Sequence, residues 1–424
     1  MEKMTFQQVN EVIYKKVLDN GLEVYVLPKK GFRKAYATFT TKYGSIDLSF
    51  ISNGEKIEVP EGIAHFLEHK MFEEEEGDVF NTFAIHGAQA NAFTSFDRTA
   101  YLFSSTTDIQ ENIETLIDFV QNPYFTDENV EKEKGIIAQE IQMYQDNPDW
   151  QLYFGLIKSL YQKHPVQIDI AGTVDSIYKI TKEQLYQCYN TFYHPSNMVL
   201  FIVGNIEPEE TINRVENNQK NKTFQKKPMI ERIYPAEPKE NNQNLKEQKL
   251  AVAIPKVLVG FKDLSVGLTG KEFIKRELAT ALLLEMLFGQ SSIFFEELTT
   301  KGLIDNSFSF EYQIENNYAF TLIGGNSINP EQLINELKEE ILKHQTDQTS
   351  LKELFERSKR KKIGELLKKL NYPEYIANQF TRYLFNKANL FDILPTMEEI
   401  TLMDIQDRLQ EFDPNRIAIS IVRS

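Results

Sequence analysis

Residues 65–69 (His-Phe-Leu-Glu-His) bring two histidines and a glutamate close together in the chain. A helix over residues 62–72 would place positions i, i+3 and i+4 on one face, so His65, Glu68 and His69 would lie side by side. Two imidazoles one turn apart suit a zinc ion, and a carboxylate beside them can take a proton from bound water. The alternative is a surface helix with two solvated histidines. With only six histidines in the chain, the spacing favours the metal site.

Two histidines leave a catalytic zinc ion one protein ligand short. The stretch Val130–Tyr144 carries an apolar stripe with helical spacing, and Glu133 and Glu140 fall within that stripe. A carboxylate that faces a core is costly unless it is paired or binds a metal. One of the two could be a ligand and the other a group that orients a histidine. A partner Lys or Arg is the alternative that this spacing leaves open.

These motifs, together with residues 91–94 (Asn-Ala-Phe-Thr), resemble those of the insulinase/pitrilysin metallopeptidases, the inverzincins. The resemblance covers essentially the whole chain, including residues 193–198 (Tyr-His-Pro-Ser-Asn-Met). It implies a zinc-dependent endopeptidase with Glu68 as general base and Glu133 as a supporting carboxylate. It also implies three zinc ligands, namely His65, His69 and Glu140.

The same resemblance implies how substrate is held. It places an edge strand beside the metal that pairs with the backbone of a peptide substrate and contains Asn91, Ala92 and Phe93. A closed chamber would favour short or unfolded peptides. Residues 62–71, 146–150 and 375–380 read like those of single-unit relatives in Firmicute bacteria that are associated with aminopentanol modification of elongation factor P.

The order of expected elements occurs twice along the chain. A helix that opens at Thr181 precedes a strand at 199–203, and a helix that opens at Thr401 precedes a strand at 417–422, a shift of about 220 residues. Residues 217–248 are polar and lack an apolar period. We therefore expect an α+β fold with two duplicated domains, each a mostly antiparallel sheet packed with helices. Their expected bounds are 1–216 and 249–424, with a linker at 217–248, and the resemblance implies that they form one half of a clamshell chamber.

The second half cannot repeat the metal site. Under the shift of about 220 residues, His65 and His69 correspond to Leu284 and Phe288, and Glu140 corresponds to Lys359. The sequence therefore predicts one zinc ion per chain, in the first half.

The resemblance also predicts a partner subunit. In the family, the half without zinc supplies an Arg and a Tyr that donate to the developing oxyanion. The matching segment here has Thr299 and Asp305 at those positions. We therefore expect a heterodimer with a related subunit that lacks the zinc motif and carries the Arg/Tyr pair. A homodimer can form in isolation but should cleave peptides poorly.

Composition limits the other classes of function. The formal net charge of the 424 residues is −15, so nucleic acid and anionic membranes are poor partners. No signal peptide and no apolar run of about 20 residues is recognisable, which predicts a cytoplasmic protein without a membrane partner. Two alternatives remain: a non-catalytic scaffold subunit, and nucleic-acid binding through the basic stretch 357–369. The acidic run Glu73–Glu76 predicts a solvated loop or a patch for basic peptides.

Overall fold

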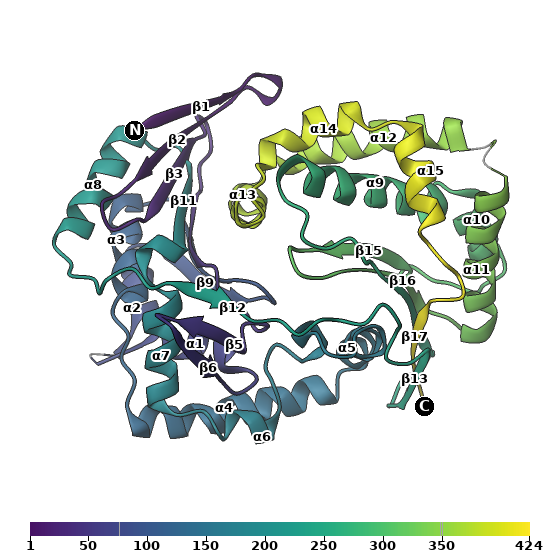
Figure 1. The fold of residues 1–424 in the computed structure, drawn as a ribbon. Helices are drawn as coiled ribbons and strands as arrows, with labels where there is room; N and C mark the ends of the chain where they lie inside the picture. The colour runs from purple at the N-terminus through teal and green to yellow at the C-terminus, as the bar shows by residue number, and fades with distance from the viewer. Residues whose placement is uncertain (76, 348, 350) are drawn as a thin grey trace. The chain divides into compact units, whose positions relative to one another are not determined.

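The computed structural model describes every residue except 76, 348 and 350. The described chain divides into two compact units, each built around a mostly antiparallel sheet (Figure 1). Unit 1 contains Met1–Ile141, Ile168–Tyr234 and Lys369–Phe385. Unit 2 contains Gln142–Gln167, Pro235–Lys368 and Asn386–Ser424, apart from the residues left undescribed.

The main sheet of unit 1 has seven strands among the described residues. All seven residues of each of its central strands β4 and β11 are buried, which explains why both segments read as nearly continuous apolar or β-branched runs. β11 pairs with β3 in parallel, and the other neighbours are antiparallel. In sheet order the strands are β1 (Glu2–Phe6), β2 (Glu11–Val17), β3 (Glu23–Pro28), β11 (Met198–Gly204), β4 (Ala35–Thr41), β10 (Thr99–Ser105) and β9 (Ala88–Thr94).

Helices and two small sheets complete unit 1. The small sheets consist of β12 (Ile230–Arg232), β5 (Ser49–Ser52) and β6 (Glu55–Glu58), and of β7 (Glu73–Glu74) and β8 (Gly77–Asp78). The helices are α1 (Ile63–Lys70), α2 (Val79–Ile85), α3 (Ile109–Val120), most of α4 (Asp127–Gln145), α6 (Val174–Ile177), α7 (Lys182–Phe192), α8 (Pro208–Lys220) and α13 (Pro373–Phe385).

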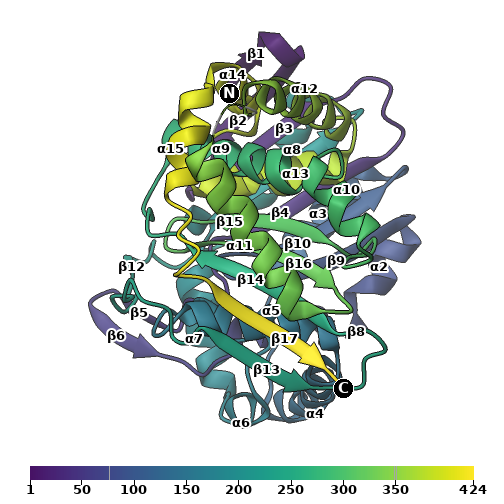
Figure 2. The same cartoon turned by 90° about the vertical axis from the view of Figure 1, so that its right-hand side faces the viewer.

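The sheet of unit 2 repeats five strands of the first sheet (Figure 2). Its order β13-β17-β14-β16-β15 corresponds strand by strand to β3-β11-β4-β10-β9, and β13 and β17 are again the parallel pair. Capping boxes at Thr181 and Thr401 open the equivalent helices α7 and α15. The predicted α+β fold and its duplication are therefore confirmed. The strands are β13 (Leu245–Lys249), β17 (Ala418–Arg423), β14 (Lys256–Lys262), β16 (Ala319–Asn326) and β15 (Ser309–Ile314).

Among the helices of unit 2, α9 is largely buried and packs against β15, α14 and α15. No single described helix is long and apolar enough to cross a membrane; α9 and α10 together pass that test by length and composition, but most of α9 is buried in the unit. The helices are α5 (Pro148–Leu160), α9 (Gly270–Phe288), α10 (Ile293–Thr300), α11 (Pro330–Thr346), nearly all of α12 (Leu351–Lys369), α14 (Ile393–Glu399) and α15 (Leu402–Gln410).

Each unit contains one helix from the other half of the chain. α5 packs on β14 and β17 of unit 2, where Gly155 lies so close to Ser420 that an added Cβ would be 2.5 Å from its Oγ. The equivalent helix α13 packs on β4 and β11 of unit 1, where the ring of Phe380 contacts Tyr25 and Phe201 at centroid distances of 5.1 and 4.6 Å.

The compact units therefore differ from the continuous domains expected at 1–216 and 249–424. An apolar stripe on a helix shows that it covers a sheet, but not which of two similar sheets it covers. Residues 217–248, expected to be a linker, contain the end of α8, all of β12 and most of β13. The sequence pattern does not predict β13, because its residues Leu-Lys-Glu-Gln-Lys are mostly polar.

We expect Phe380→Ala to lower the free energy of unfolding of unit 1 by about 3–5 kcal/mol, because the change leaves a cavity among buried aromatic rings. Urea denaturation, with hydrogen exchange of the β4 and β11 amides to identify the unit, measures the loss. Tyr372→Ala, which removes a side chain that is 51% exposed just before α13, should change stability by less than about 1 kcal/mol. Equal stabilities of the two variants would contradict the packing role of α13.

Candidate metal centre

The short helix α1 carries the first two candidate ligands, and Gly62 sets where that helix begins. Gly62 adopts a left-handed conformation with φ of 84°, and an added Cβ would lie 2.4 Å from the carbonyl oxygen of Ala171. Only glycine fits this close approach. The helix then buries Ile63, Phe66 and Leu67 and leaves the histidines on its other face. The structure ends α1 at Lys70, two residues before the expected end.

The third candidate ligand, Glu140, lies on α4 (Asp127–Gln145), the helix that carries the apolar stripe. His65 Nε2 lies 3.8 Å from Glu140 Oε1, and His69 Nε2 lies 3.6 Å from Glu140 Oε2. Potential ligand atoms of these three side chains all lie within 4.8 Å of one another. They form the only such group of histidine, cysteine or acidic side chains among the residues that the structure describes.

This donor set fits a zinc ion. Separations of 3.6 and 3.8 Å are too long for hydrogen bonds, yet close to the roughly 3.3 Å between neighbouring ligands of a tetrahedral ion with bonds of about 2.0–2.1 Å. Burial and the neighbouring charge of His69 lower the pKa of His65 to about 3, so its ring is neutral and has a lone pair to offer. Two histidines and one glutamate leave a coordination position open, as in catalytic zinc sites.

Glu133, the expected supporting carboxylate, contacts the second histidine of the motif. His69 Nδ1 donates to Glu133 Oε1 at 3.2 Å, which directs Nε2 of the same ring toward Glu140. Burial opposes protonation of His69, but the hydrogen bond to Glu133 and the nearby carboxylates raise the pKa of the ring. Burial likewise opposes ionisation of Glu133, yet its partners His69 and Lys70 lower the pKa of this carboxyl.

Glu68 is held beside this group by a residue that sequence reasoning left without a role. Thr94 Oγ1 donates to Glu68 Oε2 at 2.6 Å, and the same hydroxyl lies 3.3 Å from Thr99 Oγ1. Burial is the main reason that the pKa of Glu68 is raised, and the hydrogen bond from Thr94 opposes that shift. A pKa raised in this way suits a group that must both accept and release a proton. The only sequence signal for Thr94 was its place at the end of the 91–94 motif.

The predicted substrate strand is an edge strand. Within the described residues β9 is the last strand of its sheet and pairs with β10 alone. Asn91 is exposed, and its Oδ1 accepts from the backbone N–H of Ala92 at 2.9 Å. Because the N–H and C=O of one strand residue point the same way, Ala92 presents both groups to the open edge. Phe93 is partly exposed on the same strand.

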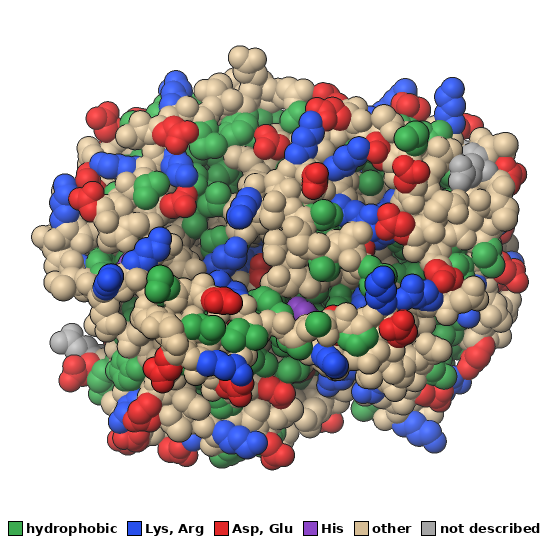
Figure 3. Space-filling model, viewed as in Figure 1, with side chains coloured by type: hydrophobic (Ala, Val, Ile, Leu, Met, Phe, Trp, Pro, Cys, Tyr) green, Lys and Arg blue, Asp and Glu red, His purple; other side chains and the backbone are tan. Residues whose placement is uncertain are grey.

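The equivalent positions of the second half are used for packing. Leu284 and Phe288 are buried in α9, and Lys359 Nζ donates to the carbonyl oxygens of Glu398 and Ile400. Other cations of the basic stretch also have partners in unit 2: Arg357 donates to the carbonyl of Ser291, and Lys361 and Lys362 pair with Glu285. Fewer cations of the stretch 357–369 are therefore available to bind the phosphates of a nucleic acid. On the face drawn in Figure 3, acidic and basic side chains are interspersed.

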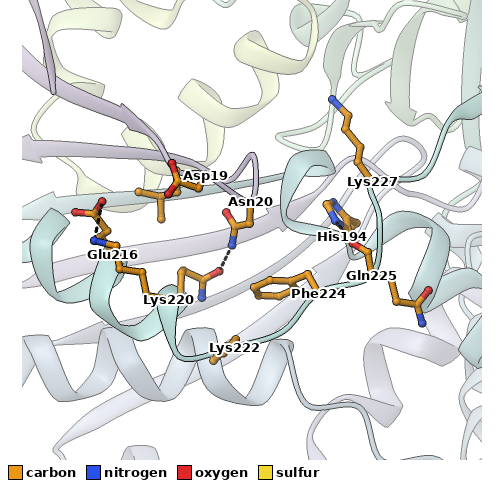
Figure 4. Close-up of a pocket in the computed structure, with 11 residues that line it drawn as sticks. Asp19, Asn20, His194, Glu216, Lys220, Lys222, Phe224, Gln225 and Lys227 are labelled. Atoms are coloured by element: carbon orange, nitrogen blue, oxygen red, sulfur yellow. Dashed lines mark hydrogen bonds and ion pairs between the residues drawn. The ribbon is translucent and has the colours of Figure 1, made fainter.

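A cavity of about 450 Å³ in unit 1 is separate from this site (Figure 4). Its lining includes His194, Phe224 and Lys222 but none of the predicted metal ligands or catalytic residues. Both ring nitrogens of His194 are engaged, one with Ser196 and the other with the carbonyl oxygen of Gln225. This histidine therefore has a structural role, as do His164 and His344, which are buried in unit 2.

We expect purified protein to bind about one zinc ion per chain, and Glu140→Gln to lose it, because a neutral amide is a poor replacement for the carboxylate ligand. Metal analysis after removal of loosely bound ions measures the ratio. Glu128→Gln, an exposed carboxylate at the start of the same helix, serves as the matched control and should keep the metal. Two zinc ions per chain, or one that survives loss of both His65 and His69, would contradict the assignment.

Comparison with known proteins agrees with this geometry. Residues 49–174, which include all the candidate ligands, match the family described as "Insulinase (Peptidase family M16)", and residues 179–362 match "Peptidase M16 inactive domain". The "Uncharacterized zinc protease YmfH" of Bacillus subtilis (strain 168) is 54% identical over 413 residues, which cover 97% of this chain and 96% of that protein.

Solved structures share the fold. A crystal structure of an M16-like peptidase from Alicyclobacillus acidocaldarius is 42% identical with a TM-score of 0.95, and the match covers 97% of this chain and 98% of that one. The periplasmic protease PqqL from Escherichia coli matches in fold, with 17% identity and a TM-score of 0.72, over 100% of this chain and 48% of its own. The agreement of motif, fold and relatives shows that this chain belongs to the insulinase family of peptidases, M16.

Proposed function

We propose that the chain is a zinc-dependent endopeptidase that hydrolyses peptides or unfolded segments. The observation that carries the proposal is the convergence of His65, His69 and Glu140 beside the buried carboxylate of Glu68, in the unit whose sheet has its open edge at β9. Relatives named as zinc proteases support the same reaction class.

The side chains divide the chemistry among them. A zinc ion held by His65, His69 and Glu140 would supply Lewis acidity and lower the pKa of a water molecule. Glu68 would accept the proton of the attacking water and pass it to the leaving amine. Thr94 fixes one oxygen of the Glu68 carboxylate during these transfers, and Glu133 keeps the His69 ring in the orientation needed to bind metal.

The open edge of β9 would hold the substrate as an added strand. Ala92 offers its backbone N–H and C=O there, and the side chain of Asn91 must give up its own hydrogen bond to Ala92 when a peptide takes its place. Main-chain hydrogen bonds supply affinity that depends little on sequence. This arrangement predicts broad selectivity, limited mainly by whether a peptide can become extended.

A non-catalytic scaffold is the second candidate, since members of this family include domains described as inactive. That description matches residues 179–362, which contain none of the four motif residues, whereas the match to the insulinase family spans residues 49–174 and contains them all. Retention of all four residues favours the enzyme. The cytoplasmic location and the association with elongation factor P modification stay predictions.

Glu68→Gln separates the two candidates. The amide keeps the shape of the side chain but cannot act as a base, so zinc should stay bound while peptide hydrolysis falls by roughly 100- to 10,000-fold. Metal content and turnover of an internally quenched peptide are measured on the same preparations. The control, Glu61→Gln, changes a neighbouring carboxylate outside the site and should leave both values unchanged. Near-normal turnover by Glu68→Gln would exclude Glu68 as the base.

We further propose that a related subunit without the zinc motif completes the active enzyme. The chain matches 48% of the length of PqqL, so two chains of this size correspond to that protease. Thr299 Oγ1 donates to the carbonyl oxygen of Phe295 in its own helix, and the Asp305 carboxylate accepts from Ser307 and Asn326. Neither side chain is suited to stabilise an oxyanion, so those donors must come from other groups.

The partner proposal predicts that the purified chain alone cleaves peptides poorly, and that co-purification with a zinc-less homologue encoded nearby raises kcat/KM by at least about 10-fold, because the missing oxyanion donors are then supplied. The control mixes the homologue with the Glu68→Gln variant, which should remain inactive. Full activity of the chain alone, unchanged when Thr299 and Asp305 are both replaced by Ala, would count against a supplied oxyanion site.

A further inference from the structure

Lys70 is a cation that the described structure buries completely, one residue after the second histidine of the motif. Its side chain has 0% exposure, and it occupies the position of the α1 stripe that follows Ile63, Phe66 and Leu67 at i, i+3, i+4 and i+7. An ammonium group in such a place is costly unless carboxylates pair with it. Its presence on an apolar face therefore needs a structural or functional reason.

Two carboxylates meet this lysine. Its Nζ donates to Oε2 of Glu73, three residues further along the chain in β7, and lies 3.5 Å from Oε2 of Glu133 on α4. The acidic run at Glu73–Glu76 was predicted to be a solvated loop or a patch for basic peptides; Glu73, at least, is engaged with Lys70, and Glu76 lies outside the described residues.

Glu133 therefore uses its two oxygens differently. Oε1 accepts from His69 Nδ1 at 3.2 Å, while Oε2 faces Lys70. If the Glu133 carboxylate were held at one oxygen only, it could rotate about its Cγ–Cδ bond. The His69 ring, which is hydrogen-bonded to it, would then change its orientation. Held at both oxygens, it fixes the plane in which His69 directs Nε2 toward Glu140.

We propose that Lys70 is a positioning residue of the metal centre, which acts through Glu133 to orient the His69 ring. The inference rests on the proposed zinc site, but it concerns metal affinity rather than peptide hydrolysis. If the chain binds zinc but does not hydrolyse peptides, the proposed role of Lys70 is therefore unaffected.

The test is the zinc affinity of the full chain, measured by competition with a chelator of known affinity. Lys70→Met keeps the length and apolar stem of the side chain and removes the charge. We expect zinc binding to weaken about 10- to 100-fold, as is usual when a group that orients a ligand is lost. The visible spectrum of the Co²⁺-loaded protein should change as well, because it reports ligand geometry.

Lys134→Met is the matched control. Lys134 is a nearly buried lysine on α4 that pairs with Glu131 at 2.5 Å and with no metal-site residue that the described structure shows. Its replacement should leave zinc affinity within about twofold of the original and the Co²⁺ spectrum unchanged. An equal loss in Lys134→Met would mean that any buried charge on these helices matters, which overturns the specific role of Lys70.

A double-mutant cycle shows whether Lys70 acts through Glu133. If it does, Glu133→Gln combined with Lys70→Met should bind zinc no more weakly than Glu133→Gln alone. Multiplied losses, or an unchanged zinc affinity in Lys70→Met, would overturn the proposal. Should Lys70→Met fail to fold, Lys70→Leu, which also removes the donor toward Glu133, takes its place, and an unchanged zinc affinity there would be equally decisive.

Discussion

The contact between α1 and α4 is made by ionisable side chains, and the chemistry of the first unit depends on how their charges are balanced. Two histidines face two glutamates across this contact, and Lys70 of α1 adds a fifth ionisable group. In an apolar surrounding such a set is stable only when every charge has a partner. A divalent cation among His65, His69 and Glu140 would add positive charge at the point where potential ligand atoms of all three lie within 4.8 Å of one another.

The second unit has the same fold, but its equivalent helices are joined by an ion pair. There α9 and α12 take the places of α1 and α4, and Glu285 of α9 pairs with Lys361 and Lys362 of α12 at 2.5 and 3.3 Å. An ion pair between two helices needs no metal, so this half keeps the fold without the candidate metal ligands. The two copies therefore differ at this contact: the first contains the candidate metal ligands, and the second contains an ion pair and buried apolar side chains.

Sequence patterns predicted much of this arrangement because several of its constraints are local. Helical spacing placed the histidines, Glu133 and Glu140, and apolar runs located β11 and β17. The same reasoning missed Lys70 although the signal was present, since a lysine at i+7 of the Ile63, Phe66, Leu67 stripe must face the core. The contact of Thr94 with Glu68, and the assignment of α5 to unit 2 and α13 to unit 1, depend on residues far apart in the chain. The spacing of residues within one segment carries no information about such contacts.

The place of α13 in unit 1 also bears on how the protein is made. A ribosome synthesises a chain from its N-terminus to its C-terminus, so the candidate metal ligands at 65–140 leave the ribosome early. Pro373–Phe385 follows only when about nine-tenths of these 424 residues have been synthesised. The sheet that supports α1 lacks the helix covering β4 and β11 until then. A nascent or prematurely terminated chain would therefore carry the candidate metal ligands on an incomplete core, and the complete metal centre would form only late in translation.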